Sequence, residues 1–383
     1  MAVTPFRIEV PDAVLDDLRE RLQRTRWPDQ IPGSAWDYGT DRDYLRELVS
    51  YWIDGFDWRA QEAKLNQLPQ YLAEVDGVRI HFVHARGNGP RPMPLLLTHG
   101  WPGSFYEMHK VIGPLSDPAA HGANPDDAFD VVVPSLPGYG FSGPTTERGF
   151  GPARMAQLLL RLMTGELGYA RFAAQGGDWG SIITTTMARL FPESLAGIHL
   201  NMLSGRLAPA DPESEEEKLL AERAARFAQE ETGYQRIQGT KPQTLAYALN
   251  DSPAGLAAWI VEKWRAWSDC GGDVERRFTK DEILTNITIY WVTGTINSSM
   301  RLYYEAAHAA SGAGPAVPTG RVEVPTAVAD FPAEIYRASR RQAEAAFNLQ
   351  RWTPMPRGGH FAAMEEPGLL VEDIREFFRP LRR

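Results

Sequence analysis

The sequence predicts an α/β fold with a mostly parallel central sheet, helices on both faces and a helical insertion. Short apolar runs closed by glycine or proline recur from residue 78 onward, and helix-compatible segments lie between them. This alternation stops near Met202 and resumes near Arg321. Strands that alternate with helices favour parallel pairing, because each crossover helix covers one face of the sheet.

Seven apolar runs are the predicted strands, and two segments between them have helical patterns. The runs cover residues 78–83, 95–98, 129–134, 171–174, 195–200, 321–324 and 349–352. The helical patterns cover residues 151–167 and 181–190.

We divide the chain into an N-terminal helical arm, a core in two parts and a helical lid between those parts. The ranges are 1–75 for the arm, 76–203 and 313–383 for the core, and 204–312 for the lid. In the arm, Leu18 and Leu22 belong to one apolar helical face, and a tryptophan-rich stretch follows. We expect the arm to wrap the core and the lid to cover what the sheet presents.

Composition narrows the classes of function. Of 383 residues, 43% are hydrophobic and 23% charged, which is typical of a globular protein. A net charge of −9 argues against a nucleic-acid surface. Cys270 is the single cysteine, so intramolecular disulfides and cysteine metal clusters are excluded. The sequence has no signal peptide or stretch of 18 apolar residues, and we expect a cytoplasmic protein without a membrane anchor.

The segment Gly176-Gly177-Asp178-Trp179-Gly180 lies where a predicted strand meets a predicted helix. It matches the G-x-S-x-G nucleophile elbow, with aspartate in the serine position. Small residues two before and two after the nucleophile let strand and helix approach closely. The alternative is an ordinary turn, because Gly-Gly-Asp is common in turns.

A second motif, His99-Gly100-Trp101-Pro102-Gly103, follows a predicted strand about 80 residues before Asp178. The α/β-hydrolase fold has its oxyanion loop in this position. We expect the backbone N–H groups of Trp101 and Trp179 to converge on an oxyanion. The alternative is a rigid loop with a packed tryptophan.

A histidine and an acid complete the candidate set. His360 follows two glycines beyond the last predicted strand, and the chain order of this fold is nucleophile, acid, histidine. Asp330 and Glu334 both lie in the interval where the acid is expected. Spacing does not choose between them.

An aspartate nucleophile indicates a particular chemistry. A carboxylate is a nucleophile at neutral pH without a base, and it displaces leaving groups from sp³ carbon to form an ester. A histidine then activates the water that hydrolyses the ester. An epoxide also needs a proton donor for its oxygen, and lid phenols are suitable. The lid contains tyrosines at positions 234, 247, 290, 303 and 304.

The chain resembles the microsomal-type epoxide hydrolases, which convert epoxides to vicinal diols. The similar segments are FRIEVPDAVLDDLRERLQRTRWPD, THGWPGS, PSLPGYGFS, QGGDWGS, GYQRIQGTKPQTLAYALNDSPAGLAAWIVEKW, NITIYWVTGTINSSMRLYYEA and RGGHFAAMEEP. The resemblance implies that Asp178 is the nucleophile and His360 the base. It also implies Glu334 as the acid, and Tyr234 and Tyr304 as the tyrosines that polarise the epoxide. We expect no hydrophobic anchor of the kind that the membrane-bound members have.

Two other functions compete with this one. A haloalkane dehalogenase uses the same aspartate and histidine, but a halide leaves without a proton and needs no phenols. A non-catalytic receptor with this fold needs no complete catalytic set. Trp101, Trp179, Tyr234 and Tyr304 predict a pocket for an apolar or aromatic epoxide. We expect no cofactor or metal, a possible homodimer, and a role in detoxification or secondary metabolism.

Overall fold

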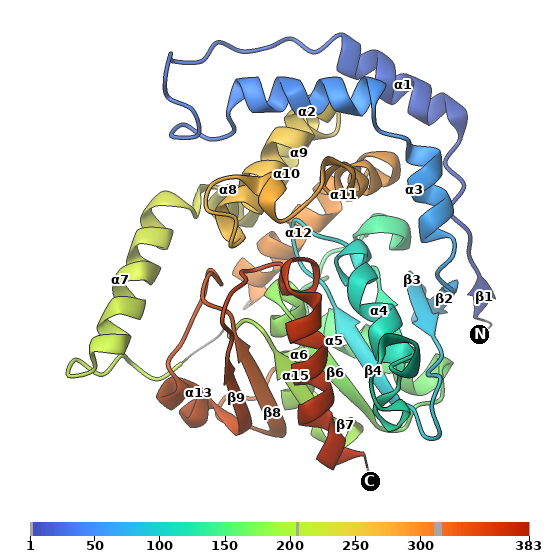
Figure 1. Ribbon diagram of the computed structural model, residues 1–383, viewed down its shortest axis with the longest axis vertical. Helices are drawn as coiled ribbons and strands as arrows, with labels where there is room; N and C mark the ends of the chain where they lie inside the picture. Colours follow the sequence, from blue (N-terminus) through green and yellow to red (C-terminus); the bar gives the residue numbers. More distant parts are fainter. Residues whose placement is uncertain (1–2, 204–206, 310–315, 383) are drawn as a thin grey trace.

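The computed structural model describes residues 3–203, 207–309 and 316–382, and its centre is a mixed sheet (Figure 1). In these ranges the sheet order is β1-β2-β3-β5-β4-β6-β7-β8-β9. The strands are β1 Thr4–Pro5, β2 Gln70–Val75, β3 Val78–Ala85, β4 Met93–Thr98, β5 Phe129–Pro134, β6 Phe172–Gly176, β7 Leu195–Leu200, β8 Val322–Asp330 and β9 Phe347–Pro354. From β5 to β9 the pairing is parallel. The predicted α/β-hydrolase architecture is therefore confirmed.

The sheet extends further toward the N-terminus than the sequence analysis expected. Strand β2 lies inside the segment 1–75 and pairs antiparallel with β3. Asp76 and Gly77 join the two strands, with φ angles of 51° and 77°. Positive φ at both central residues is the conformation of the tightest hairpin turns, for which Asp-Gly is a strong signal. The end of the segment treated as arm is thus an edge strand of the sheet.

Helices cover both faces of the sheet (Figure 1). On one face, α4 (His109–Ser116) packs against α15 (Pro367–Phe378). On the other, α5 (Pro152–Arg161) packs against α6 (Asp178–Leu190). The apolar runs of β4, β5, β6 and β7 are buried between these layers, which explains why they read as continuous hydrophobic segments.

The segment 204–312 contains a set of helices that lies over one end of the sheet (Figure 1). They are α7 (Glu215–Glu230), α8 (Gly233–Thr240), α9 (Pro242–Leu249), α10 (Pro253–Trp267), α11 (Lys280–Thr293) and α12 (Ile296–Ala307). Helix α11 contacts the loop after β4: the Tyr290 hydroxyl donates to the Gly103 carbonyl at 2.6 Å, and the Asn286 amide donates to the Pro102 carbonyl at 2.8 Å. The lid therefore touches the carboxyl ends of the strands.

The N-terminal helices α1 (Asp12–Gln23) and α2 (Arg42–Asp54) lie on the outside of the lid (Figure 1). Helix α3 (Trp58–Leu65) then leads to β2. The Tyr51 hydroxyl donates to Asp281 at 2.9 Å. Arg21 and Asp251 form an ion pair at 2.7 Å. The first two helices therefore pack on the lid, whereas we expected the arm to wrap the core. Among the residues described, no helix is long and apolar enough to cross a membrane.

The approach of α6 to β4 gives a test of the fold. A Cβ atom added to Gly180 would lie 2.0 Å from the Thr98 carbonyl oxygen. We expect Gly180→Ala to lower the free energy of unfolding by about 3 kcal/mol, because backbone must shift. Gly165→Ala is the control, since its Cβ would meet nothing within 4 Å. Chemical denaturation measures both, and equal stability of the two variants would contradict close packing at Gly180.

Candidate active site

Asp178 lies at a sharp turn between β6 and α6. It is the first residue of the helix, and its φ of 48° is unusual for a residue with a side chain. The backbone N–H of Trp101 donates to its Oδ1 at 2.7 Å. A Cβ added to Gly100 would lie 2.1 Å from the same oxygen, so glycine allows the loop to come this close. The carboxylate is thereby held against the predicted oxyanion loop.

The structure brings His360 and Glu334 to this carboxylate. His360 Nε2 lies 3.4 Å from Asp178 Oδ2, and its Nδ1 lies 2.7 Å from Glu334 Oε1. The backbone N–H of His360 donates to the Trp267 carbonyl at 3.0 Å, which fixes the imidazole beneath the lid. Histidine and acid are both buried. Along the chain the order is nucleophile, acid and histidine, and in space the histidine lies between the two carboxylates.

Asp330, the other candidate acid, has a different partner. The Arg337 guanidinium donates to its two carboxylate oxygens at 2.8 and 2.6 Å. This bidentate pair closes the base of the loop that carries Glu334. Contact with the histidine thus belongs to Glu334, whose Oε1 also accepts from the Ile335 backbone N–H at 2.6 Å.

A lid residue that the sequence analysis missed also holds this loop. Arg223 on α7 donates to the carbonyl of Pro332 and to the carbonyl of Glu334, each at 2.7 Å. The two terminal nitrogens of the guanidinium each bind a different carbonyl, so the loop is fixed at two points. Only the folded chain shows this contact, because Arg223 and Glu334 are separated by 111 residues.

The charge of His360 depends on its two neighbours. Burial would lower its pKa, but the charges of Glu334 and Asp178 and their hydrogen bonds outweigh burial and hold the pKa well above its ordinary value. The imidazole is therefore protonated between two carboxylates near neutral pH. Loss of the charge on Asp178, as in an ester, would remove part of this effect and make His360 a stronger proton donor and an available base.

Five aromatic side chains, which we call the aromatic cage, surround the carboxylate: Trp101, Trp179, Tyr234, Trp267 and Tyr303. Trp101 and Tyr234 stack at 5.2 Å between ring centroids. Tyr303 is perpendicular to Trp179 at 4.8 Å, and Trp267 is perpendicular to His360 at 5.2 Å. Burial, followed by nearby charge, raises the pKa of Tyr234 and of Tyr303 well above 10. Both phenols keep their protons at neutral pH and can donate them.

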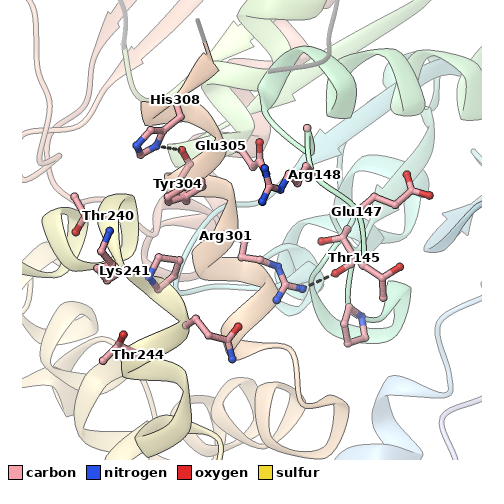
Figure 2. Close-up of a pocket in the computed structure, with 15 residues that line it drawn as sticks. Thr145, Glu147, Arg148, Thr240, Lys241, Thr244, Arg301, Tyr304, Glu305 and His308 are labelled. Atoms are coloured by element: carbon pink, nitrogen blue, oxygen red, sulfur yellow. Dashed lines mark hydrogen bonds between the residues drawn. The ribbon is translucent and has the colours of Figure 1, made fainter. Parts of the chain in front are cut away.

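The structure does not bring Tyr304, which the resemblance indicated, to the aromatic cage. Its side chain is 38% exposed and stacks on His308 at 4.1 Å, and it lines an open outer pocket of about 940 Å³ with Arg301 and Lys241 (Figure 2). Successive residues of a helix point about 100° apart, so only one of the pair can face the cage. That residue is Tyr303, which is buried.

Trp179 contributes to the site through its side chain and lies close to it through its backbone. Its indole lies in the cage, and its backbone N–H belongs to the first turn of α6, where amides have no intrahelical acceptor. A role for this N–H beside that of Trp101 stays a prediction. Among the residues described, no group of three or more histidine, cysteine, aspartate and glutamate side chains could hold a metal ion.

The ion pairs of His360 predict a pH dependence. We expect Glu334→Gln to lower the pKa of His360, as read from its imidazole NMR signals. A raised pKa stabilises the fold fully below the unfolded value of ~6.5 and loses this effect as pH rises through the folded pKa. The stability difference between wild type and Glu334→Gln should therefore shrink at alkaline pH. An unchanged His360 titration in the variant would contradict the assigned contact.

Comparisons with known proteins agree with this geometry. Residues 3–108 match the family model "Epoxide hydrolase N terminus", and residues 93–243 match "alpha/beta hydrolase fold". Epoxide hydrolase 1 of Sus scrofa is 40% identical over 98% of this chain and 88% of its own length. Juvenile hormone epoxide hydrolase 2 of Ctenocephalides felis is 38% identical over 97% and 84%. The structure of Aspergillus niger epoxide hydrolase is 29% identical, with a TM-score of 0.87 over 100% of this chain and 97% of that one. The chain therefore belongs to the epoxide hydrolase family.

Proposed function

We propose that this enzyme converts an epoxide and water to a vicinal diol through an ester on Asp178. One observation carries the proposal: a carboxylate, a histidine–glutamate pair and two protonated phenols surround the same space. The side chain of Asp178 is 13% exposed although it lies beneath the lid, and from this we infer a cavity beside its carboxylate. An epoxide in that cavity would have a nucleophile on one side and proton donors on the other.

In the first step, an Asp178 oxygen attacks an epoxide carbon and the carbon–oxygen bond breaks. The ring oxygen then carries negative charge and takes a proton from a phenol. The phenolate regains a proton from the His360 imidazolium, whose pKa falls once the charge on Asp178 is lost, so His360 enters the second step as a neutral base. Tyr234 and Tyr303 are the donors, because both are buried in the cage and both remain protonated. Burial in an apolar site also strengthens their hydrogen bonds to the developing alkoxide.

In the second step, His360 removes a proton from water, and the water oxygen attacks the ester carbonyl of Asp178. The carbonyl oxygen becomes an oxyanion beside the Trp101 N–H, which already donates to Asp178 at 2.7 Å. Collapse of the tetrahedral intermediate releases the diol and restores the carboxylate. Glu334 stabilises the imidazolium that forms during this step.

The cage supports an apolar substrate, such as an aryl or alkyl epoxide, since tryptophan and tyrosine rings form its walls. Two phenols also favour epoxide opening over dehalogenation, because a departing halide needs no proton. We retain the cytoplasmic location and the homodimer as predictions.

The two adjacent lid tyrosines provide a matched test. Tyr234→Phe and Tyr303→Phe should each slow ester formation, since a positioned acid contributes about 10²–10⁴-fold in rate. Tyr304→Phe is the control and should react like wild type. Stopped-flow measurement of ester formation with an aryl epoxide separates them. A defect in Tyr304→Phe with normal Tyr303→Phe would reverse our assignment of the donor.

The ester itself can be detected. We expect His360→Gln to form the ester but to hydrolyse it more than about 10²-fold slower, because water is no longer activated. Intact-protein mass should then rise by one substrate mass, localised to the peptide that contains Asp178. In ¹⁸O-water, one turnover by excess wild-type enzyme should give unlabelled diol. Labelled diol in that turnover would mean that water attacks the epoxide directly.

A further inference from the structure

Glu107 is a carboxyl group of the site that the mechanism above does not use. It lies in a short 3₁₀ helix, Phe105–Met108, directly after the oxyanion loop. Its side chain folds back onto that loop: Oε1 lies 1.3 Å from the point where a Cβ on Gly103 would be, and the Gly100 backbone N–H donates to the carboxyl group. Glycine at position 103 therefore leaves the space that the carboxyl group occupies.

Two consecutive backbone amides hold two carboxyl groups. The Gly100 N–H donates to Glu107, and the Trp101 N–H donates to Asp178. The two carboxyl groups therefore lie against neighbouring residues of one loop, and the charges of His360 and Asp178 both act on Glu107. The carboxyl group of Glu107 thus lies on the same side of the site as the nucleophile and the base.

The surroundings of Glu107 differ from those of a structural carboxylate. Among the ion pairs formed by the residues described, none includes Glu107. Burial raises its pKa, the positive charge of His360 lowers it and the negative charge of Asp178 raises it, and the net result is a pKa of about 8. Burial raises the pKa of Tyr139 and of Tyr290 well above 10, and the charge of Glu107 is among the charges that act on both phenols. At neutral pH the group is therefore an uncharged carboxyl whose oxygens can still accept hydrogen bonds.

Glu107 also borders open space. The residues on either side of it are buried, but Glu107 itself is only half-buried. Asp178 has the same property. Accessible area is area that a water-sized probe can reach, and a water held there needs two or more polar partners. His360 and Glu107 can be two such partners.

We propose that Glu107 holds the hydrolytic water against His360 in the second step. This inference rests on the proposed ester mechanism. The water oxygen forms a bond to the ester carbon of Asp178 while one of its hydrogens passes to His360 Nε2. The second hydrogen stays on the oxygen and donates a hydrogen bond to Glu107, whose protonation does not change. Ester formation involves no water, so Glu107 acts in hydrolysis alone.

Variants at position 107 test this assignment when the two steps are measured separately. Glu107→Leu removes the acceptor and should slow ester hydrolysis about 10²-fold, since a misplaced reactant costs this much. Glu107→Gln keeps a carbonyl acceptor of the same size and should retain most of that rate. Ester formation should stay within about threefold of wild type in both variants. A merely structural role would slow both steps together and would give no rescue by glutamine.

Two further variants complete the design. Glu262→Leu is the matched control, because Glu262 is half-buried with a pKa raised mainly by burial but lies on α10 and pairs with Lys263. Gly103→Ala keeps Glu107 but fills the space of its carboxyl group, so it should show the same hydrolysis defect. This variant decides the question if Glu107→Leu does not fold. A wild-type hydrolysis rate in Glu107→Leu, or in Gly103→Ala if Glu107→Leu does not fold, would overturn the inference.

The control for the underlying mechanism is independent. Epoxide turnover by wild type and ester accumulation in His360→Gln test the proposed function without Glu107. If wild type forms no ester, the proposed function fails. If it forms one and Glu107→Leu hydrolyses it normally, only the role of Glu107 fails.

Discussion

The position of the Asp178 carboxylate is the constraint on which the rest of the structure depends. A non-glycine residue at a φ of 48° costs about 1–3 kcal/mol, so packing must hold it there. That packing is the contact of α6 with β4, where Gly180 lies against the Thr98 carbonyl. Because the helix cannot retreat, the carboxylate projects beyond the sheet edge and meets the Trp101 N–H. Strain at one residue is thus balanced by close backbone contact at another.

The lid contributes side chains to the site, and it holds in place the loops that carry the other site residues. Helices α8 and α12 carry Tyr234 and Tyr303, and α10 carries Trp267. Helix α11 fixes the oxyanion loop, and Arg223 on α7 fixes the loop of the acid. The lid is therefore part of the catalytic arrangement, and the N-terminal helices that clasp it stabilise the site indirectly. The hydrogen bond and the ion pair between arm and lid are consistent with this indirect role.

Charge in the site is balanced within a small, enclosed volume. His360 lies between two carboxyl groups, so its proton is held until one of those charges disappears. Ester formation on Asp178 would remove that charge, which makes the first chemical step the signal that prepares the base for the second. Glu107 remains neutral beside these groups, and a neutral carboxyl adds a polar partner for water without adding a third negative charge.

Much of this protein could be predicted from sequence, because the signals are local. The central strands, the Asp178 elbow, the Trp101 loop and His360 each follow from apolar runs and glycines within a few residues. The Asp76-Gly77 hairpin turn also has a local signal, because Asp-Gly favours positive φ at both residues.

Choices between near neighbours were decided only by tertiary structure. Asp330 and Glu334 fit the expected spacing equally well. In the folded chain Asp330 pairs with Arg337, and Glu334 contacts His360. Tyr303 and Tyr304 are identical side chains, and the resemblance indicated Tyr304, which lies outside the cage. Helix α12 turns Tyr303 toward Trp179 and Tyr304 toward the outer pocket. A rotation of about 100° between successive residues separates a buried proton donor from a surface side chain, and the packing of the helix determines that rotation.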